Sequence, residues 1–318
     1  MTIPETLSLR LSAIRYAADG INLYEFRTLD GARLPGFEPG AHVDLHLPNG
    51  MVRQYSLAEG HGDGRAYVVG VKLDPDSRGG SKYMHEQLKV GTVMPVGLPR
   101  NHFPLEAGAG RSVFVAGGIG ITPIHCMIRA LAGAGQPWEL HYAVRRRAEA
   151  AFLAELADAP GGRLVLHVDE ECDGAFLDVA RVVADAGRDA HLYCCGPGPM
   201  LEAFVRATQG LPAEHVHYEY FSADVVPDKT GGFTVELART QRAVYVPQGK
   251  TIAEALRDEG VDIMVSCEQG VCGACETRVL EGDIEHRDLI LTEQEKAAGK
   301  LMMICVSSCS GDRLVLDL

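Results

Sequence analysis

The sequence predicts a multidomain protein: an antiparallel all-β region, then an α/β region with a parallel sheet, then a small cysteine-rich tail. The length of 318 residues allows two or three domains, each with its own core. Near residue 110 the hydrophobic pattern changes from short alternating runs to apolar strands separated by helical segments. In the tail, four of the nine cysteines follow one regular spacing.

Residues 1–106 contain short runs in which apolar and polar residues alternate, at 7–11, 43–47 and 67–71. Alternation with a period of two is typical of strands that bury one face. Turn-forming pairs such as Asp19-Gly20 and Pro39-Gly40 separate the runs. Many short strands at even spacing predict an antiparallel β-barrel or a sandwich, and we place this first domain at 1–106.

From residue 107 the expected structure is α/β. Apolar strands at 113–116, 140–144, 164–168 and 192–195 alternate with helical segments such as 123–131. This alternation indicates a parallel sheet with crossover helices. The segment 222–232 is typical of a linker, so the predicted boundaries are 107–224 for the second domain and 225–318 for the third.

The tail also carries a well-marked helix. Thr251 and Glu254 have the spacing of a capping box, and Gly260 lies where a C-terminal cap belongs.

The composition argues against several functional classes. With 43 acidic and 30 basic residues the net charge is −13, which does not suit a nucleic-acid binder. An odd cysteine count in a chain this long is unlike a secreted disulfide framework, and the first residues lack a secretory signal. The longest uncharged run, 112–128, is too short to span a membrane. We therefore expect a soluble cytoplasmic protein, a monomer, with reduced thiols or metal ligands.

The cysteines of the tail have metal-ligand spacing. Cys267, Cys272 and Cys275 form C-x4-C-x2-C, and Cys305 follows after 29 intervening residues. This spacing is that of plant-type [2Fe–2S] ligands, where three thiolates come from one loop and one from a distant strand. A tetrathiolate zinc site is the alternative, but it usually shows two C-x2-C pairs and only one is present.

The loop at 267–277 resembles that of a plant-type ferredoxin, and this resemblance implies a β-grasp sheet with a crossing helix. The family pattern favours Cys305 over the nearby Cys309 as the fourth ligand. Gly270 and Gly273 would let the loop wrap closely around a cluster and aim backbone N–H groups at the sulfurs.

Two loops in the second domain have nucleotide-binding character. Gly117, Gly118 and Gly120 follow an apolar strand, with Thr122 suited to the N-cap and Pro123 to the first position of the next helix. Glycines permit a tight turn and close approach of a pyrophosphate to free N–H groups. The segment 193–200, with Cys195-Gly196-Pro197 at its centre, also ends a strand before a helix. Two such loops at carboxyl ends of parallel strands would flank one crevice.

Together these two loops resemble the NAD(P)-binding domain of the ferredoxin-reductase superfamily. The resemblance places Cys195 beside the nicotinamide, whereas Cys126, Cys172 and Cys194 fit small structural thiols better. Arg145, at the start of an Arg-Arg-Arg run, could bind a 2′-phosphate or belong to a solvated helix entry; Asp169 could accept the ribose hydroxyls. The nearest relatives use NADH, which is the donor we expect.

A flavin site is expected in the first domain. The stretch Arg53-Gln54-Tyr55-Ser56-Leu57 matches the superfamily pattern R-x-Y-S, in which Arg meets a phosphate, the ring packs on the isoalloxazine and the hydroxyl reaches flavin N5. Read alone, these residues are an ordinary strand. A second segment, Ser77-Arg78-Gly79-Gly80-Ser81, would contribute to the same site. In it Ser81 would cap a helix and Arg78 would be part of an anion pocket. Two arginines at one terminal phosphate suit FMN.

The whole chain resembles the FMN-using branch that includes phthalate dioxygenase reductase and the vanillate O-demethylase reductases. Residues 101–105 fit the segment that closes the flavin domain. Glu219-Tyr220-Phe221 resembles the superfamily's terminal E-x-aromatic, which implies that Glu219 lies in the active site and that Phe221 covers the flavin. By composition alone Phe221 would be a core residue.

The resemblance implies a reductase that passes a hydride from NADH to FMN, then single electrons through the cluster to a terminal Rieske-type oxygenase. Six of the 13 net negative charges, 15 acidic minus 9 basic, lie from Gly231 onward, so an acidic surface could steer a basic partner or merely keep the protein in solution. The alternatives are delivery to a cytochrome P450, general ferric or cytochrome reduction, and, in a different class, a redox-sensing module.

Overall fold

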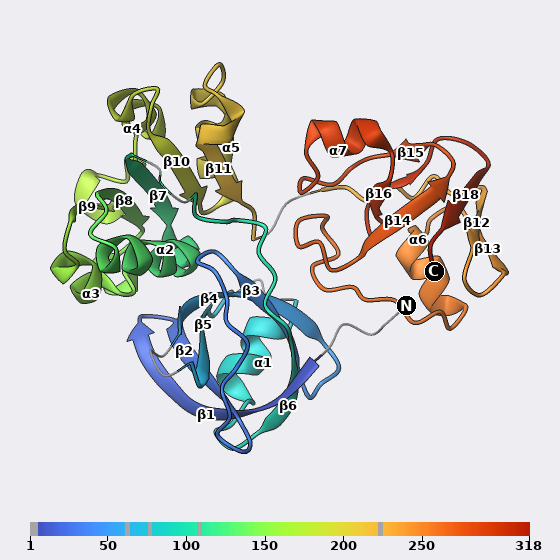
Figure 1. Ribbon diagram of the computed structural model, residues 1–318, viewed down its shortest axis with the longest axis horizontal. Coiled ribbons are helices and arrows are strands. Elements are labelled where there is room, and N and C mark those ends of the chain that lie inside the picture. The colour runs from blue at the N-terminus through green and yellow to red at the C-terminus, as the bar shows by residue number, and fades with distance from the viewer. Residues whose placement is uncertain (1–5, 61–63, 76–77, 107, 109, 222–224) are drawn as a thin grey trace. The chain divides into compact units, whose positions relative to one another are not determined.

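A computed structural model describes residues 6–60, 64–75, 78–106, 108, 110–221 and 225–318. It divides into two compact units, Thr2–Glu219 and Tyr220–Leu318. The first unit holds both the all-β region and the α/β region that the sequence predicts (Figure 1). Ser77 and part of the predicted linker, 222–224, lie outside the described residues.

The all-β region is a closed antiparallel barrel, which decides between the two alternatives left by the sequence. The strand order is β1-β2-β5-β4-β3-β6. These strands are β1 (Thr6–Ala18), β2 (Ile21–Thr28), β3 (His42–His46), β4 (Val52–Gly60), β5 (Ala66–Lys72) and β6 (Val93–Gly97). Alternate side chains point into the barrel, where Leu9, Tyr24, Val43, Leu57 and Val69 are buried in one core. Helix α1 (Gly80–Glu86) adds Met84 to this core.

The α/β region is a parallel five-stranded sheet of order β11-β10-β7-β8-β9. Its strands are β7 (Ser112–Gly117), β8 (Trp138–Val144), β9 (Gly162–Val168), β10 (His191–Cys195) and β11 (Val216–Glu219). The helices are α2 (Ile121–Gly133), α3 (Leu153–Asp158), α4 (Val179–Ala186) and α5 (Gly198–Ala207). The central strand β7 is buried along its whole length, as expected for a strand covered on both faces. Helix α2 lies between this sheet and the barrel (Figure 1).

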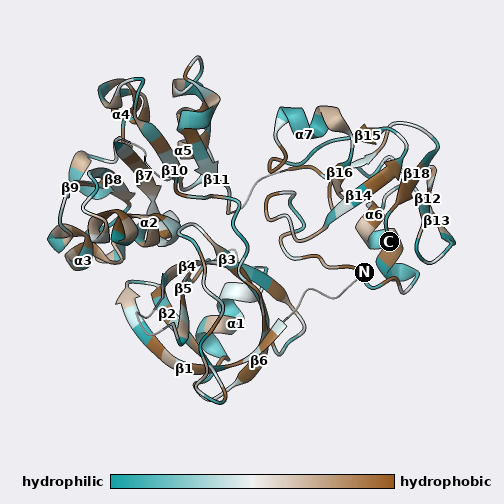
Figure 2. Cartoon of the chain, viewed as in Figure 1, coloured by the Kyte–Doolittle hydropathy of each residue, from teal (hydrophilic) through white to brown (hydrophobic). Residues whose placement is uncertain are grey.

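The second unit is a small α+β structure. A mixed sheet of order β13-β12-β18-β14-β16 contains β12 (Phe233–Leu237), β13 (Arg242–Val246), β14 (Glu276–Glu281), β16 (Leu301–Met303) and β18 (Arg313–Leu316). A two-stranded pair joins β15 (Ile284–Glu285) to β17 (Ser308–Cys309). The helices are α6 (Ile252–Asp258) and α7 (Glu293–Ala298), and strands β12 and β18 and helix α6 contribute apolar residues to one core (Figure 2).

Both helices of this unit begin with a capping box. In α6 the Thr251 hydroxyl accepts from the Glu254 N–H and the Glu254 carboxylate accepts from the Thr251 N–H, as the sequence predicts. Thr292 and Glu295 do the same in α7. Gly260 follows α6 with φ +69°, in the left-handed region expected of a C-terminal cap. A cap of this type is worth about 1 kcal/mol to helix stability.

The loops after β7 and β10 pack on each other through their backbones. A Cβ on Gly120 would lie 2.2 Å from the Cys195 carbonyl oxygen, and one on Gly117 would lie 2.5 Å from Pro197 Cδ. A Cβ on Gly196 would meet Met200 Sδ at 2.7 Å and the Gly117 backbone at 3.1 Å. These three glycines are therefore required by loop-to-loop contact. By contrast Gly118, with φ +53°, faces open space.

This packing predicts that Gly120→Ala destabilises the protein by about 1–3 kcal/mol, because the added methyl group must displace backbone atoms. Gly120 has φ −60°, so the effect would be steric and not conformational. Gly198→Ala is the matched control, since a Cβ there meets nothing within 4 Å at the start of α5. Thermal unfolding should show a lower Tm for Gly120→Ala only; equal melting temperatures would contradict this account.

Candidate active site and cysteine loop

The two segments of the predicted flavin phosphate site lie together on the barrel. Arg53, on β4, extends beside the start of α1, and its Nη2 donates to the Arg78 carbonyl oxygen at 3.3 Å. Gly80 makes room for this guanidinium, because a Cβ there would lie 2.6 Å from Arg53 Nε. Gly79, with φ +97°, turns the chain into the helix. Arg53 and Arg78–Ser81 thus lie on one surface, which carries a cationic side chain.

The predicted role of Ser81 as a helix cap is wrong. Helix α1 begins at Gly80, and its N-cap is Gly79, which has no side chain to cap with. Ser81 lies inside the first turn, where its hydroxyl accepts from the Asp74 N–H at 3.2 Å. The hydroxyl therefore holds the preceding loop on the helix.

The remaining residues of the flavin motif alternate along β4. Leu57 is fully buried in the barrel, so it is a core residue. Tyr55 packs against the same core, and burial raises the pKa of its phenol. Gln54 is partly exposed and lies opposite Asp44 of β3. Ser56 is 5% exposed and lies opposite His42.

The glycine loop after β7 differs from the prediction in its helix start. Helix α2 begins at Ile121 with Gly120 as N-cap, so Thr122 is not the cap. The Thr122 hydroxyl instead donates to the Ile119 carbonyl oxygen at 3.0 Å, inside the loop. Pro123 is the third helical residue and not the first, but it is still in the first turn, where no N–H is needed for the helix. The turn Gly118–Gly120 runs directly into α2, and the Gly118 carbonyl oxygen accepts from the Ile121 N–H.

The residues predicted to determine nucleotide specificity follow neighbouring strands. Val144 and Val168 are paired in register, so Arg145 and Asp169 leave the sheet side by side at its carboxyl edge. Arg147 makes two hydrogen bonds to Glu171, at 2.8 and 2.6 Å, and Arg146 donates to Glu149 at 2.8 Å. Arg145 is exposed and has no side-chain partner among the described residues. Arg146 and Arg147 are thus paired with carboxylates, whereas Arg145 has no such pair within the part of the chain that the structure describes.

Ser56, Cys195 and Glu219 converge where the barrel meets the parallel sheet. Cys195 and Glu219 are paired in register at the ends of β10 and β11. Burial raises the pKa of Glu219 to about 8, and a hydrogen bond with the Ser56 hydroxyl offsets part of this rise. The other oxygen of Glu219, Oε2, is buried without a partner in the described parts of the chain. Burial and the nearby carboxyl raise the pKa of the Cys195 thiol, so both acids are neutral at pH 7.

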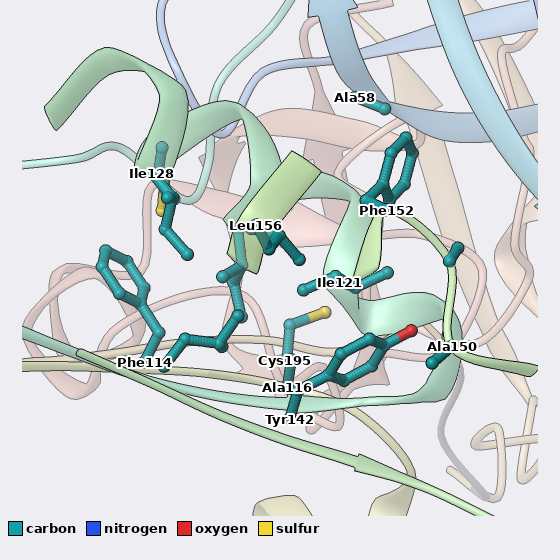
Figure 3. Packing of buried hydrophobic residues seen from close by; sticks show 14 of the residues in the cluster. Ala58, Phe114, Ala116, Ile121, Ile128, Tyr142, Ala150, Phe152, Leu156 and Cys195 are labelled. Atoms are coloured by element: carbon teal, nitrogen blue, oxygen red, sulfur yellow. The ribbon is translucent and has the colours of Figure 1, made fainter. Parts of the chain in front are cut away.

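The close surroundings of Cys195 are apolar. Figure 3 shows its sulfur among Tyr142, Ala116 and Ile121, below a layer formed by Leu156 and Phe152. A thiol and a carboxyl in such a site favour their uncharged forms, and they can offer or accept hydrogen bonds without adding charge.

A second group of polar residues on the barrel, around His42 and Asp44, was not predicted from the sequence. His42 and Asp44 on β3 are buried, and Arg100 donates to Asp44 Oδ2 at 2.6 Å. Both ring nitrogens of His42 are buried without a partner among the residues that the structure describes. Polar residues at alternate positions of an otherwise apolar strand are the signal that marks them.

The thiols of the cysteine loop approach each other in two pairs. Cys275 Sγ lies 3.2 Å from Cys305 Sγ, and the thiols of Cys267 and Cys272 share a hydrogen bond. That bond, with N–H groups of Val271, Gln269 and Cys272, lowers the pKa of Cys267 to about 6. Within the described ranges, no three side chains of ligand type gather around a single point that could hold one metal ion. The two-by-two arrangement fits a cluster with two irons, each taking two thiolates.

Glycines and a competing cysteine complete this loop. Gly270 and Gly273 both have φ +69°, and a Cβ on Gly270 would lie 2.7 Å from Val306 Cγ2. Cys309 makes hydrogen bonds outside the cysteine pairs: its sulfur accepts from the Gly311 N–H at 3.3 Å, and its thiol donates to the Arg313 carbonyl oxygen at 3.4 Å.

Phe221 is 39% exposed and belongs to the same unit as the cysteine loop, whereas Ser56 and Glu219 belong to the other.

The raised pKa of Glu219 predicts a pH effect. Glu219 is protonated below about pH 8 and ionises above it, so a step that uses the neutral carboxyl should slow as the pH rises through 8. Glu219→Gln stays neutral, and its rate should lack this inflection. Single-turnover flavin reduction by NADH from pH 6 to 9.5 measures both. The same inflection in Glu219→Gln would show that another group titrates.

Within the described residues every helix is too short or too polar to cross a bilayer.

Residues 235–310 match the family described as 2Fe-2S iron-sulfur cluster binding domain. The chain is 48% identical to phenoxybenzoate dioxygenase subunit beta of Ectopseudomonas oleovorans, covering 98% of this chain and 97% of that protein. It is 43% identical to vanillate O-demethylase oxidoreductase of Pseudomonas sp. (strain HR199 / DSM 7063), covering 97% and 98%.

Solved structures agree over nearly the whole chain. Phthalate dioxygenase reductase, described as modular for electron transfer from pyridine nucleotides to [2Fe–2S], is 36% identical with a TM-score of 0.73, covering 98% of both chains. An intact type IV self-sufficient cytochrome P450 monooxygenase is 39% identical with a TM-score of 0.86; the match covers 98% of this chain but 41% of that one. The chain is an oxidoreductase, and it belongs to the family of oxygenase-system reductases with a C-terminal 2Fe-2S domain that includes phthalate dioxygenase reductase and the vanillate O-demethylase oxidoreductases.

Proposed function

We propose that this protein is the reductase component of a two-component oxygenase system, carrying electrons from NADH through FMN and a [2Fe–2S] cluster to a terminal oxygenase. The observation that carries the proposal is the convergence of Ser56, Cys195 and Glu219 in a chain that also holds the paired cysteine loop. NADH supplies two electrons as a hydride, the cluster accepts one at a time, and a flavin can divide the pair.

The residues divide these tasks between three proposed domains: 1–106 for FMN, 107–224 for NADH and 225–318 for the cluster. Arg53 and Arg78, with the N–H groups of Gly79, Gly80 and Ser81, would hold the FMN phosphate. Tyr55 would pack on the flavin ring, with Gln54 and Leu57 fixing its strand. Ser56 and the neutral Glu219 carboxyl would orient the reacting edge of the flavin by hydrogen bonds.

The nucleotide would lie along the carboxyl edge of the parallel sheet. Gly118 offers the open face of the first loop, and N–H groups at the start of α2 would meet the pyrophosphate. Gly117, Gly120, Gly196 and Pro197 shape the crevice, and Thr122 and Pro123 hold the start of α2. Cys195 would lie beside the nicotinamide, where its neutral thiol adds no charge to the site.

NADH is the favoured donor because two of the three arginines are already ion-paired. Arg146 and Arg147 bind carboxylates, which leaves Arg145 alone to meet a 2′-phosphate, while Asp169 can accept ribose hydroxyls. Phe221, two residues after Glu219, would cover the flavin ring until the nicotinamide enters.

The terminal oxygenase as partner is supported by the names of the relatives. We further propose that this oxygenase is of the Rieske type, that the reductase is monomeric and that it works in the cytoplasm. The matched P450 monooxygenase gives the competing acceptor class.

Purified protein should show a mixed flavin and iron–sulfur spectrum that bleaches with anaerobic NADH, and extracted flavin should be FMN. Reoxidation by a Rieske oxygenase but not by a P450 separates the acceptors; a colourless protein would end the proposal.

Cys305 and Cys309 provide a matched test of the cluster ligands Cys267, Cys272, Cys275 and Cys305. Cys305→Ala should lose the iron and the visible cluster absorption while retaining flavin, because Cys305 is paired with Cys275. Cys309→Ala should retain two irons per chain, since its sulfur belongs to a turn at Gly311. Iron content and electron paramagnetic resonance of the reduced protein measure the outcome. Cluster loss in Cys309→Ala alone would reverse the assignment.

A further inference from the structure

Helix α2 is attached to the barrel through one of its faces. His125 Nδ1 lies 3.0 Å from the Ala58 carbonyl oxygen, and Arg129 Nη1 donates to Glu59 Oε2 at 3.0 Å. One turn earlier, Thr122 packs on β5, where a Cβ on Gly70 would lie 2.6 Å from its methyl carbon. Residues 122, 125 and 129 share a helix face by their spacing. Two successive residues of β4 thus bind this helix.

The strand offers an irregular position to His125. The β4–β5 ladder shifts register between Leu57 and Glu59, so Ala58 is the extra residue of a β-bulge. The extra residue of a bulge is left unpaired in the ladder, so its carbonyl is available to a side chain. Ala58 is fully buried and lies two residues after Ser56. A hydrogen bond here therefore holds the part of β4 that carries the proposed flavin contact.

His125 is held on its other sides as well. The side chain is 1% exposed, its ring stacks on Phe152 with centroids 4.1 Å apart and an interplanar angle of 14°, and Nε2 lies 3.1 Å from Glu155 Oε2. Figure 3 shows Phe152 close to Ala58 of the barrel strand. The Ala58 carbonyl can only accept, so the ring proton at this contact is on Nδ1. Phe152, which has φ +60°, stands immediately before α3.

We propose that His125 is a positioning residue for hydride transfer, holding the flavin strand at a fixed distance from the glycine loop of the nucleotide site. The inference rests on the proposed function. His125 is one helical turn from Ile121, where α2 leaves the glycine loop, so of the two side chains that bind α2 to β4 it is the one nearer the loop and nearer Ser56. Loss of this bond would shift the nicotinamide relative to the flavin without removing a contact to either.

The test uses the full-length holoprotein and variants that separate the ring from its N–H. His125→Phe keeps a ring on Phe152 but loses the donor; His125→Asn places an amide N–H near the Nδ1 position. We expect flavin reduction at saturating NADH to fall about 10- to 100-fold in His125→Phe, as for a misplacement of about 1 Å, and to recover largely in His125→Asn. The affinity for NADH, the flavin content and the iron content should stay within about threefold of wild type.

Glu155→Gln is the matched control, since it alters only the Nε2 contact of a carboxylate that is 58% exposed. It should reduce flavin at the wild-type rate. Stopped-flow absorbance gives the flavin-reduction rate and the long-wavelength band formed between nicotinamide and flavin, which should weaken in His125→Phe.

Wild-type rates in His125→Phe, or equal losses in the Phe and Asn variants, would overturn the proposal. If His125→Phe does not fold, His125→Asn and His125→Gln replace it, because only Asn presents an amide at the Nδ1 position; equal rates would then overturn it. A wild-type protein that NADH does not reduce would instead refute the proposed function.

Discussion

The contact between two glycine loops is the constraint on which the active site depends. Gly117 ends β7 and Gly120 follows it, and both meet the segment Cys195–Pro197 at the end of β10 at distances that leave no space for a Cβ. Because β7 and β10 are neighbouring parallel strands, this contact fixes the carboxyl ends of both. Gly120 in this contact is also the N-cap of α2, and the Cys195 side chain is buried in the apolar cluster that the sheet shares with α2 and the barrel.

Electrostatics in that layer follow from the packing. Burial raises the pKa values of Glu219 and Cys195, which favours the neutral forms of groups that can be charged in water. Neutral hydrogen-bond donors and acceptors can orient a bound ring at a lower desolvation cost than ionised groups. The cationic residues Arg53 and Arg78 lie on the barrel surface, at the start of α1.

Much of this organisation can be predicted from the sequence, because it depends on local patterns. The four strands expected at 113–195, the capping box at Thr251 and the helix end at Gly260 are all confirmed. The helix starts at Thr122 and Ser81 were predicted wrongly because a hydroxyl residue is normally the better cap. In both loops glycine takes the cap position, since the chain must turn where a side chain would clash.

Other features depend on contacts between residues far apart in the chain. From the sequence alone His125 belongs to an apolar helix face. Its hydrogen-bond partner is the Ala58 carbonyl at a β-bulge, and no local sequence pattern predicts that bulge. The arginine run after β8 looks like one anion site, but Glu149 and Glu171 occupy two of its members. Whether a charge is free to meet a ligand is decided by the tertiary fold.

The distribution of the cysteines has a consequence for the protein's chemical durability. Of the nine, only Cys172 is exposed; Cys126 is partly buried and the other seven are buried. Flavoproteins that meet oxygen can release peroxide, which attacks accessible thiolates before buried thiols. Oxidative damage should therefore begin at Cys172, on the short helix that starts at Asp169, at the carboxyl edge of the parallel sheet. The same exposure makes Cys172 a natural attachment point for a thiol-reactive probe at that edge.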